Sequence, residues 1–290
     1  MRPALLFLFL PLLLFLVEAG AQTATTPETR SEDKAPDSTG SLAMGVAAFK
    51  AGDHGRALTE LQGPAAAGEA IAQFYLGVLY AEGWGTLPDP VTARGWFERA
   101  AHQGFAKAEH NLGVMYQKGE GVPANPTQAR DWFERAAAHG SARSAQQLGL
   151  MFFRGEGVAK DFAAAHRWWE QALKGGEADA GYNLGILHLR GMGVDRDPAA
   201  AALWWERAAR KGSVLAQNAL GGACEKGEGV TVDPVRALAW YRLATRGGLN
   251  IAAQNAALLE ARLGPEQLEA AERLEQKLAA ELPPEVTSSP

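Results

Sequence analysis

A period of 36 residues runs through the middle of the chain and constrains its fold more than any other feature. Leu-Gly pairs recur at this step without an insertion or deletion, each followed by a Gly-x-Gly pair and then by a tryptophan. Self-similarity at such a period indicates a solenoid of stacked supersecondary units. The pairs are Leu76-Gly77, Leu112-Gly113, Leu148-Gly149, Leu184-Gly185 and Leu220-Gly221, and the tryptophans are Trp96, Trp132, Trp168, Trp204 and Trp240.

Local signals divide each unit into two helices. In the second unit, apolar residues between Ala108 and Tyr116 follow helical spacing around the Leu-Gly pair. Gly119 predicts the end of this helix, because glycine readily adopts the positive φ of a helix C-cap. Asn125 and Pro126 predict the start of the next helix, as an N-cap followed by proline in the first turn. The other units carry Asp89-Pro90, Asp161-Phe162, Asp197-Pro198 and Asp233-Pro234 there.

Two positions in each unit predict how its helices pack. A glycine inside a helix, such as Gly113, costs about 1 kcal/mol relative to alanine, so we expect it to permit the close approach of a neighbouring helix. The tryptophan of the second helix lies on an apolar stripe, and we expect it in the core between units. A second tryptophan follows at Trp169 and Trp205, where we expect partial exposure. No strand signal interrupts the series, so the expected fold class is all-α.

The first twenty-one residues have the composition of a secretory signal peptide. Arg2 supplies a positive charge, an apolar run extends from Ala4 to Val17, and small residues precede an expected cleavage site before Gln22. An uncleaved membrane anchor is the alternative, but the run is shorter than the roughly twenty residues that a spanning helix needs. Residues 22–40 are rich in Thr, Ser, Pro and charge and predict a disordered linker. The sequence therefore predicts export to the periplasm, with secretion as the alternative.

The consensus of the five units resembles the Sel1-like repeat, a relative of the tetratricopeptide repeat. Its order is Ala-x-x-x-Leu-Gly-x-x-Tyr-x-x-Gly-x-Gly-Val, then Asp, then Ala-x-x-Trp-Phe-x-x-Ala-Ala-x-x-Gly, and it extends over residues 70–250. The resemblance implies a right-handed superhelical α-solenoid of stacked helix-turn-helix repeats, which binds other proteins as an adaptor in exported and membrane-associated assemblies. Residues 41–69 resemble a degenerate first repeat, residues 251–285 resemble polar capping helices, and residues 286–290 predict a disordered tail.

The same resemblance implies that the first helix of each unit lines a concave groove. Some expected partner contacts are large apolar residues, for which packing against the first helix of the next unit is the alternative role. Others are basic residues, one near the end of this helix in each of four units. These residues, which we call the basic column, bind an anionic partner or complement the helix dipole by about 0.3–1 kcal/mol. The expected contacts are Phe74, His110, Lys118, Gln146, Phe153, Arg154, Tyr182, Leu189, Arg190 and Lys226, of which Lys118, Arg154, Arg190 and Lys226 form the basic column.

Composition argues against several other functions. The net charge of −5 differs from that of nucleic-acid-binding proteins, which are usually basic. The single cysteine excludes an internal disulfide and a cysteine-based zinc site, and no histidine pair has metal-ligand spacing. The Gly-x-Gly pairs follow a helix, whereas a phosphate-binding loop follows a strand. We therefore expect no metal, no cofactor and no nucleic acid, and membrane contact only through an uncleaved signal segment.

The predicted function is that of an exported, non-enzymatic scaffold that binds a protein or peptide, acidic if the basic column contacts it. The alternative is a binder of cell-wall glycan or peptide that uses exposed Trp84, Trp169 and Trp205. A hydrolase is least favoured, because the sequence shows no nucleophile and base in a catalytic arrangement.

Overall fold

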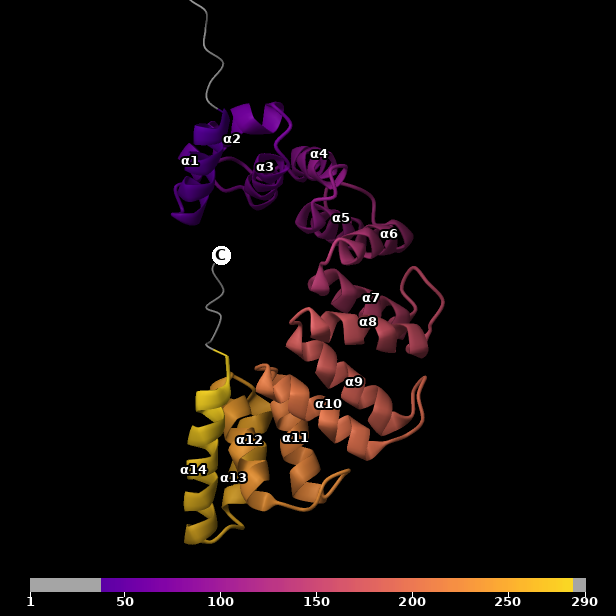
Figure 1. The fold of residues 1–290 in the computed structure, drawn as a ribbon, viewed down its shortest axis with the longest axis vertical. Coiled ribbons are helices and arrows are strands. Elements are labelled where there is room, and N and C mark those ends of the chain that lie inside the picture. The colour runs from indigo at the N-terminus through magenta and orange to yellow at the C-terminus, as the bar shows by residue number, and fades with distance from the viewer. Residues whose placement is uncertain (1–37, 284–290) are drawn as a thin grey trace, which may run out of the picture. The chain divides into compact units, whose positions relative to one another are not determined.

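The computed structural model describes residues 38–283, which contain fourteen helices and no strand. The helices follow one another in chain order and alternate between a first helix, here called A, and a second, called B (Figure 1). Their bounds are α1 Ser38–Lys50, α2 His54–Ala66, α3 Ala70–Glu82, α4 Pro90–Ala101, α5 Ala106–Lys118, α6 Pro126–Ala138, α7 Ala142–Arg154, α8 Phe162–Lys174, α9 Ala178–Arg190, α10 Pro198–Arg210, α11 Val214–Lys226, α12 Pro234–Arg246, α13 Asn250–Glu260 and α14 Pro265–Glu281.

The all-α solenoid of helix-turn-helix repeats is confirmed. In each of the five 36-residue repeats the A and B helices pack against each other, and each B helix also contacts the A helix that follows it. The buried residues form four clusters, and every cluster contains residues from more than one hairpin. A single hairpin therefore has no complete core of its own, as expected for a repeat array.

The predicted helix ends in the second and third repeats are also confirmed. The side chain of Asn125 accepts a hydrogen bond from the backbone N–H of Gln128 at 3.1 Å, which caps α6. Asp161 caps α8 in the same way through the N–H of Ala164, at 2.9 Å. Gly119 ends α5 in the left-handed conformation, with φ +80°. These local signals mark where a helix starts and ends, and they do not depend on packing between repeats.

The glycine of each Leu-Gly pair lies against an aromatic ring of the B helix in its own repeat. A Cβ atom built on Gly113 would lie 2.5 Å from Cε1 of Phe133, far inside van der Waals contact. The close approach predicted for this glycine is therefore confirmed. The five contacts are Gly77–Phe97, Gly113–Phe133, Gly149–Trp169, Gly185–Trp205 and Gly221–Tyr241.

The core position predicted for the periodic tryptophans is confirmed for Trp240, whereas the other four are only partly buried against the core clusters. The ring held in the core is the residue after the periodic tryptophan, because that position faces the A-helix glycine. These rings are at most 3% exposed, whereas four of the five periodic tryptophans are only partly buried and Trp240 alone is fully buried. An arginine one turn later covers three of them, with its guanidinium carbon 4.4 to 4.9 Å from the ring centroid. The covered pairs are Trp96–Arg99, Trp132–Arg135 and Trp204–Arg207.

The second glycine of each Gly-x-Gly loop determines how closely consecutive repeats approach. Gly121 has φ +70° and lies against the first residue of the preceding B helix, so that a Cβ atom would be 2.5 Å from the carbonyl oxygen of Pro90. Gly157 makes the equivalent contact with Pro126. A side chain at these positions would strain the backbone and push the two repeats apart.

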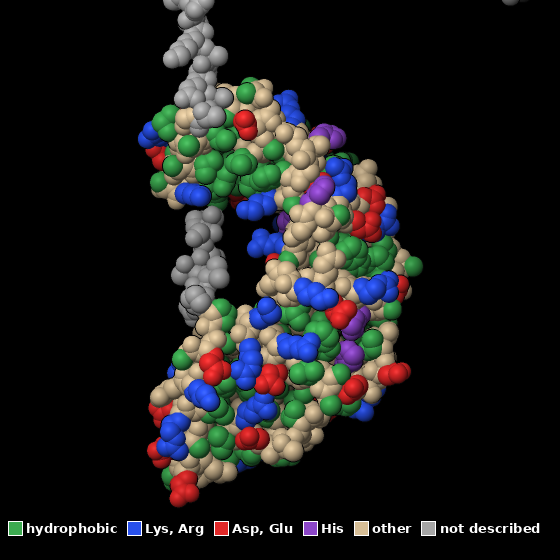
Figure 2. All heavy atoms as spheres, viewed as in Figure 1, with side chains coloured by type: hydrophobic (Ala, Val, Ile, Leu, Met, Phe, Trp, Pro, Cys, Tyr) green, Lys and Arg blue, Asp and Glu red, His purple; other side chains and the backbone are tan. Residues whose placement is uncertain are grey.

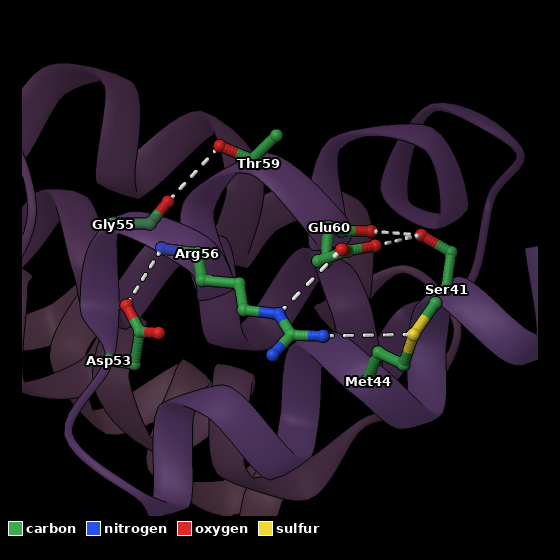
Figure 3. A network of polar contacts seen from close by, with 7 residues as sticks. All are labelled: Ser41, Met44, Asp53, Gly55, Arg56, Thr59 and Glu60. Carbon is green, nitrogen blue, oxygen red and sulfur yellow. Dashed lines mark hydrogen bonds and ion pairs between the residues drawn. The ribbon is translucent and has the colours of Figure 1, made fainter.

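The hairpin of α1 and α2 precedes the first repeat and is held by polar contacts (Figure 3). The hydroxyl of Ser41 donates hydrogen bonds to the backbone and carboxylate oxygens of Glu60, at 2.7 and 3.1 Å. Arg56 forms an ion pair with the same carboxylate at 3.8 Å. Helix α1 itself begins at Ser38. The linker prediction for residues 22–40 is therefore wrong at its C-terminal end.

The last helix, α14, packs against α12. The carboxylate of Glu275, nearly buried, pairs with Arg246 at 2.9 Å. Arg242 on α12 pairs with Glu260 of α13 at 2.6 Å. The signal segment, residues 22–37 of the linker and the tail predicted over 286–290 lie outside the described residues. Between residues 38 and 283, no helix is long and apolar enough to cross a membrane.

We expect Gly113→Ala to destabilise the array. The new methyl group must displace the ring of Phe133, and such overpacking costs about 1–3 kcal/mol, more than the roughly 1 kcal/mol that alanine gains in helix propensity. Gly95→Ala in α4 is the matched control, because nothing lies within 4 Å of a Cβ atom built there. Urea unfolding followed by circular dichroism should show lower stability for Gly113→Ala and equal or higher stability for Gly95→Ala. Equal stabilisation by both substitutions would contradict the packing argument.

Candidate functional site

Two adjoining hollows lie on the N-terminal A helices, with volumes of about 720 and 600 Å³. Phe74, Lys107 and Arg143 line both hollows, so we treat the two as one groove and call it the N-terminal groove. Its other lining residues include parts of α1, α3, α5 and α7. Figure 2 shows apolar side chains gathered over α1 and α3, beside basic side chains. The structure thus leaves an apolar and basic hollow open on the A helices.

One wall of the N-terminal groove is aromatic. The rings of Phe49 and Tyr75 have centroids 4.6 Å apart. The rings of His54 and Trp84 are stacked, with centroids 4.7 Å apart and an interplanar angle of 10°. Phe49 also contacts Trp84, at 5.9 Å, which joins the two pairs into one cluster. Rings that support one another in this way form a preformed apolar surface.

Basic side chains outnumber acidic ones in the N-terminal groove. Lys50, Lys107 and Arg143 line it, against Glu82 and Glu177. Its charge is therefore positive near neutral pH.

His110 contributes no charge to the groove at neutral pH. Its ring nitrogen Nδ1 lies 2.8 Å from the hydroxyl oxygen of Ser144. Burial, together with the positive charge of Arg143, lowers the pKa of His110 to about 4. The imidazole is neutral at pH 7 and acts as a hydrogen-bonding group.

The structure places two of the ten expected contacts, Phe74 and His110, in this groove. Phe153 packs against Phe162 and Trp169, with centroid distances of 5.4 and 5.6 Å. The remaining apolar contacts, Tyr182 and Leu189, pack against a buried core cluster, and Gln146 is partly buried. These apolar residues thus pack within the array, Phe153 against the B helix of its own repeat, and their contact with a partner stays a prediction.

The basic column is exposed at the C-terminal ends of the A helices. Lys118 lies 3.5 Å from Glu120, and Arg154 lies 3.5 Å from Glu156. Arg190 and Lys226 end α9 and α11. The helix dipole explains a cation at each of these positions without a partner, so contact between this column and an anionic partner also stays a prediction.

The expected contacts did not include several residues that form the groove. The 36-residue period places Lys107 and Arg143 on the groove-lining face of consecutive A helices, although they are not among the ten expected contacts. Phe49 and Trp84 come from α1 and from the loop after α3, so no repeat position could identify them.

The expectation of exposed tryptophans at positions 169 and 205 is wrong. Trp169 is 1% exposed and Trp205 is 3% exposed, because each ring lies against an A-helix glycine. Trp84 is partly buried and stacks on His54. A row of three exposed tryptophans for sugar stacking does not exist.

Two reactive side chains in the described part of the chain, Ser144 and Cys224, are buried. Ser144 contacts the base His110, but its side chain is fully buried and does not reach solvent. Cys224 is buried as predicted, and burial raises the pKa of its thiol to about 11, which keeps it protonated. Within residues 38–283, no three His, Cys, Asp or Glu side chains are grouped so that they could hold a metal ion.

The repeat profile of one family covers most of the array. The Sel1 repeat matches residues 70–105, 106–141, 142–177, 178–213 and 214–249. The chain belongs to the Sel1 repeat family. Proteins of this family generally mediate protein–protein interactions and generally act as non-catalytic scaffolds.

Two solved structures support this assignment. A Sel1 repeat protein from Oxalobacter formigenes is 32% identical, with a TM-score of 0.72 over 81% of this chain and 99% of that chain. A protective antigen of uropathogenic Escherichia coli strains, which displays an SLR fold, is 28% identical, with a TM-score of 0.74 over 84% of this chain. The match covers 54% of that antigen, about half its length. No curated protein matches this Sel1 repeat chain.

We expect the stability of the Sel1 array to decline as the pH falls below about 6.5. The pKa of His110 is about 4 in the folded chain and about 6.5 in the unfolded chain. The unfolded chain therefore takes up this proton first, and stability is lost progressively between these two values. The control variant is His110→Gln, which introduces the residue found at the equivalent position, Gln146, of the next repeat. Between pH 7 and pH 4.5, its free energy of unfolding should fall by roughly 1–3 kcal/mol less than that of the unmodified chain. Urea unfolding at both pH values measures this difference, and identical losses would refute it.

Proposed function

We propose that this Sel1 repeat protein is an exported scaffold that binds a protein or peptide partner along its A helices. The general role of the family in protein–protein interaction supports this proposal. The observation that carries it is the N-terminal groove, where aromatic and aliphatic side chains of α1 and α3 remain open while the B helices pack into the array. Partner-binding sites combine such preformed apolar surfaces with a few polar groups.

The proposal centres partner binding on Phe74 and His110, which line the groove. The basic column, with Gln146, Phe153, Tyr182 and Leu189, would extend the contact along later A helices. A partner that used the whole set would contact α3, α5, α7, α9 and α11. Such an extended surface is how repeat arrays generally engage their ligands.

Export is the second part of the proposal. It rests on the sequence of residues 1–21, where Arg2 precedes an apolar run that ends in small residues. We place the scaffold in the periplasm, so that its partners are exported proteins, peptides or cell-wall components.

We expect substitution in the groove to reduce partner capture. The purified chain is immobilised, exposed to proteins of the exported fraction, and its bound proteins are identified by mass spectrometry. Phe74→Ala should lower recovery of a specific partner about fivefold or more, since a central apolar contact contributes at least about 1 kcal/mol. Leu203→Ala is the control, because Leu203 is half exposed on the B helix α10. Circular dichroism verifies that both variants fold, and equal recovery by both would refute a partner site in the groove.

We expect residues 1–40, fused to alkaline phosphatase, to direct that enzyme to the periplasm, where it becomes active. Arg2→Glu should reduce the activity, because export signals need a positive N-terminal region. N-terminal sequencing of the exported chain should begin at Gln22. An inactive fusion that stays in the cytoplasm would refute export.

A further inference from the structure

Lys107 and Arg143 differ from the other basic residues of the A helices in their position. Each is the second residue of its helix, α5 or α7, and each is exposed. Neither side chain has an ion pair or hydrogen bond within residues 38–283, although both line the N-terminal groove. By contrast, Lys118 and Arg154 end the same two helices and pair with Glu120 and Glu156.

The fold itself does not favour cations at these two positions. The N-terminal end of a helix carries a partial positive charge, so a basic side chain in the first turn is repelled there. The same position holds Ile71 in the first repeat, Asp179 in the fourth and Leu215 in the fifth. The repeat can therefore be built with an apolar or an acidic residue at this position. Packing and local electrostatics give no reason for two consecutive cations.

The surroundings of the two cations define what they can recognise. They lie on a groove whose other wall contains Phe49, Tyr75 and Trp84. The carboxylates of Glu82 and Glu177 also line the groove, but neither forms an ion pair with Lys107 or Arg143 within the described chain. The groove thus presents an aromatic surface next to two cations whose charges are not matched.

We propose that the N-terminal groove selects an extended peptide segment in which an aromatic or large aliphatic side chain lies next to carboxylates. This inference rests on the proposed function and specifies the partner. The ring cluster of Phe49, Tyr75 and Trp84 takes the apolar side chain, and Lys107 and Arg143 pair with the carboxylates. Charge complementarity favours an acidic segment and rejects a basic one, which would meet repulsion from both cations.

Selection from random peptides tests this directly. A display library of random twelve-residue peptides is selected on the purified chain, and the most enriched peptide is synthesised with a fluorescent label. We expect enrichment of Asp or Glu within two residues of Phe, Tyr, Trp or Leu. Enrichment of basic or uncharged sequences, or of no sequence above background, overturns the proposal.

Charge reversal identifies the residues involved. Lys107→Glu with Arg143→Glu should weaken binding of the labelled peptide roughly tenfold or more, because carboxylate pairing is lost and repulsion replaces it. Arg167→Glu with Lys174→Glu is the matched control, with the same change of charge at two exposed positions of the B helix α8. It should change the dissociation constant, measured by fluorescence anisotropy, by about twofold at most. Equal weakening by the two double variants would show a general effect of charge and overturn the assignment.

Capture of the natural partner by the groove variants distinguishes a failure of this inference from a failure of the proposed function on which it rests. If Phe74→Ala reduces capture while Lys107→Glu with Arg143→Glu leaves it unchanged, partner binding in the groove stands and the acidic specificity fails. If neither reduces capture, both fail. Reduced capture by both variants, with the Arg167 and Lys174 control unchanged, supports both.

Discussion

The contact between an A-helix glycine and a B-helix ring is the constraint on which the array depends. At Gly113 and at its equivalents, the missing side chain leaves room for a ring that would otherwise collide with the helix. The two helices of each hairpin can therefore approach closely, and the ring is removed from water. Each hairpin obtains its shape from this contact, while its remaining apolar surface is buried only by its neighbours.

The surface of the A helices can vary because this packing does not involve it. The second residue of the A helix is isoleucine, lysine, arginine, aspartate or leucine in the five repeats, without any change in the helix bounds relative to the repeat. The N-terminal groove arises where such variable positions meet side chains from the preceding hairpin. Lys107 and Arg143, the proposed carboxylate contacts, thus lie at a repeat position that the fold leaves unconstrained.

The sequence predicts the fold well because the repeat presents the same local signals five times. Asn125, Gly119 and their equivalents mark helix ends that depend only on neighbouring residues. The orientation of the tryptophans could not be predicted in the same way, since Trp132 and Phe133 both belong to one apolar stripe. Consecutive helical residues point about 100° apart, and the position of Gly113 on the partner helix decides which of them is buried. The aromatic wall of the groove was missed because Phe49 and Trp84 lie outside the A-helix repeat positions.

The loop glycine that touches the preceding repeat has a consequence for how such a chain can grow. The first turn of each B helix contacts the loop glycine of the next repeat. Each repeat therefore contains both a loop glycine and the helix turn that such a glycine contacts, as Gly121 contacts Pro90 and Gly157 contacts Pro126. Both halves of the junction are encoded within one 36-residue segment. Duplication of a whole segment would therefore create a compatible junction on each side, so that evolution can lengthen or shorten the array one repeat at a time.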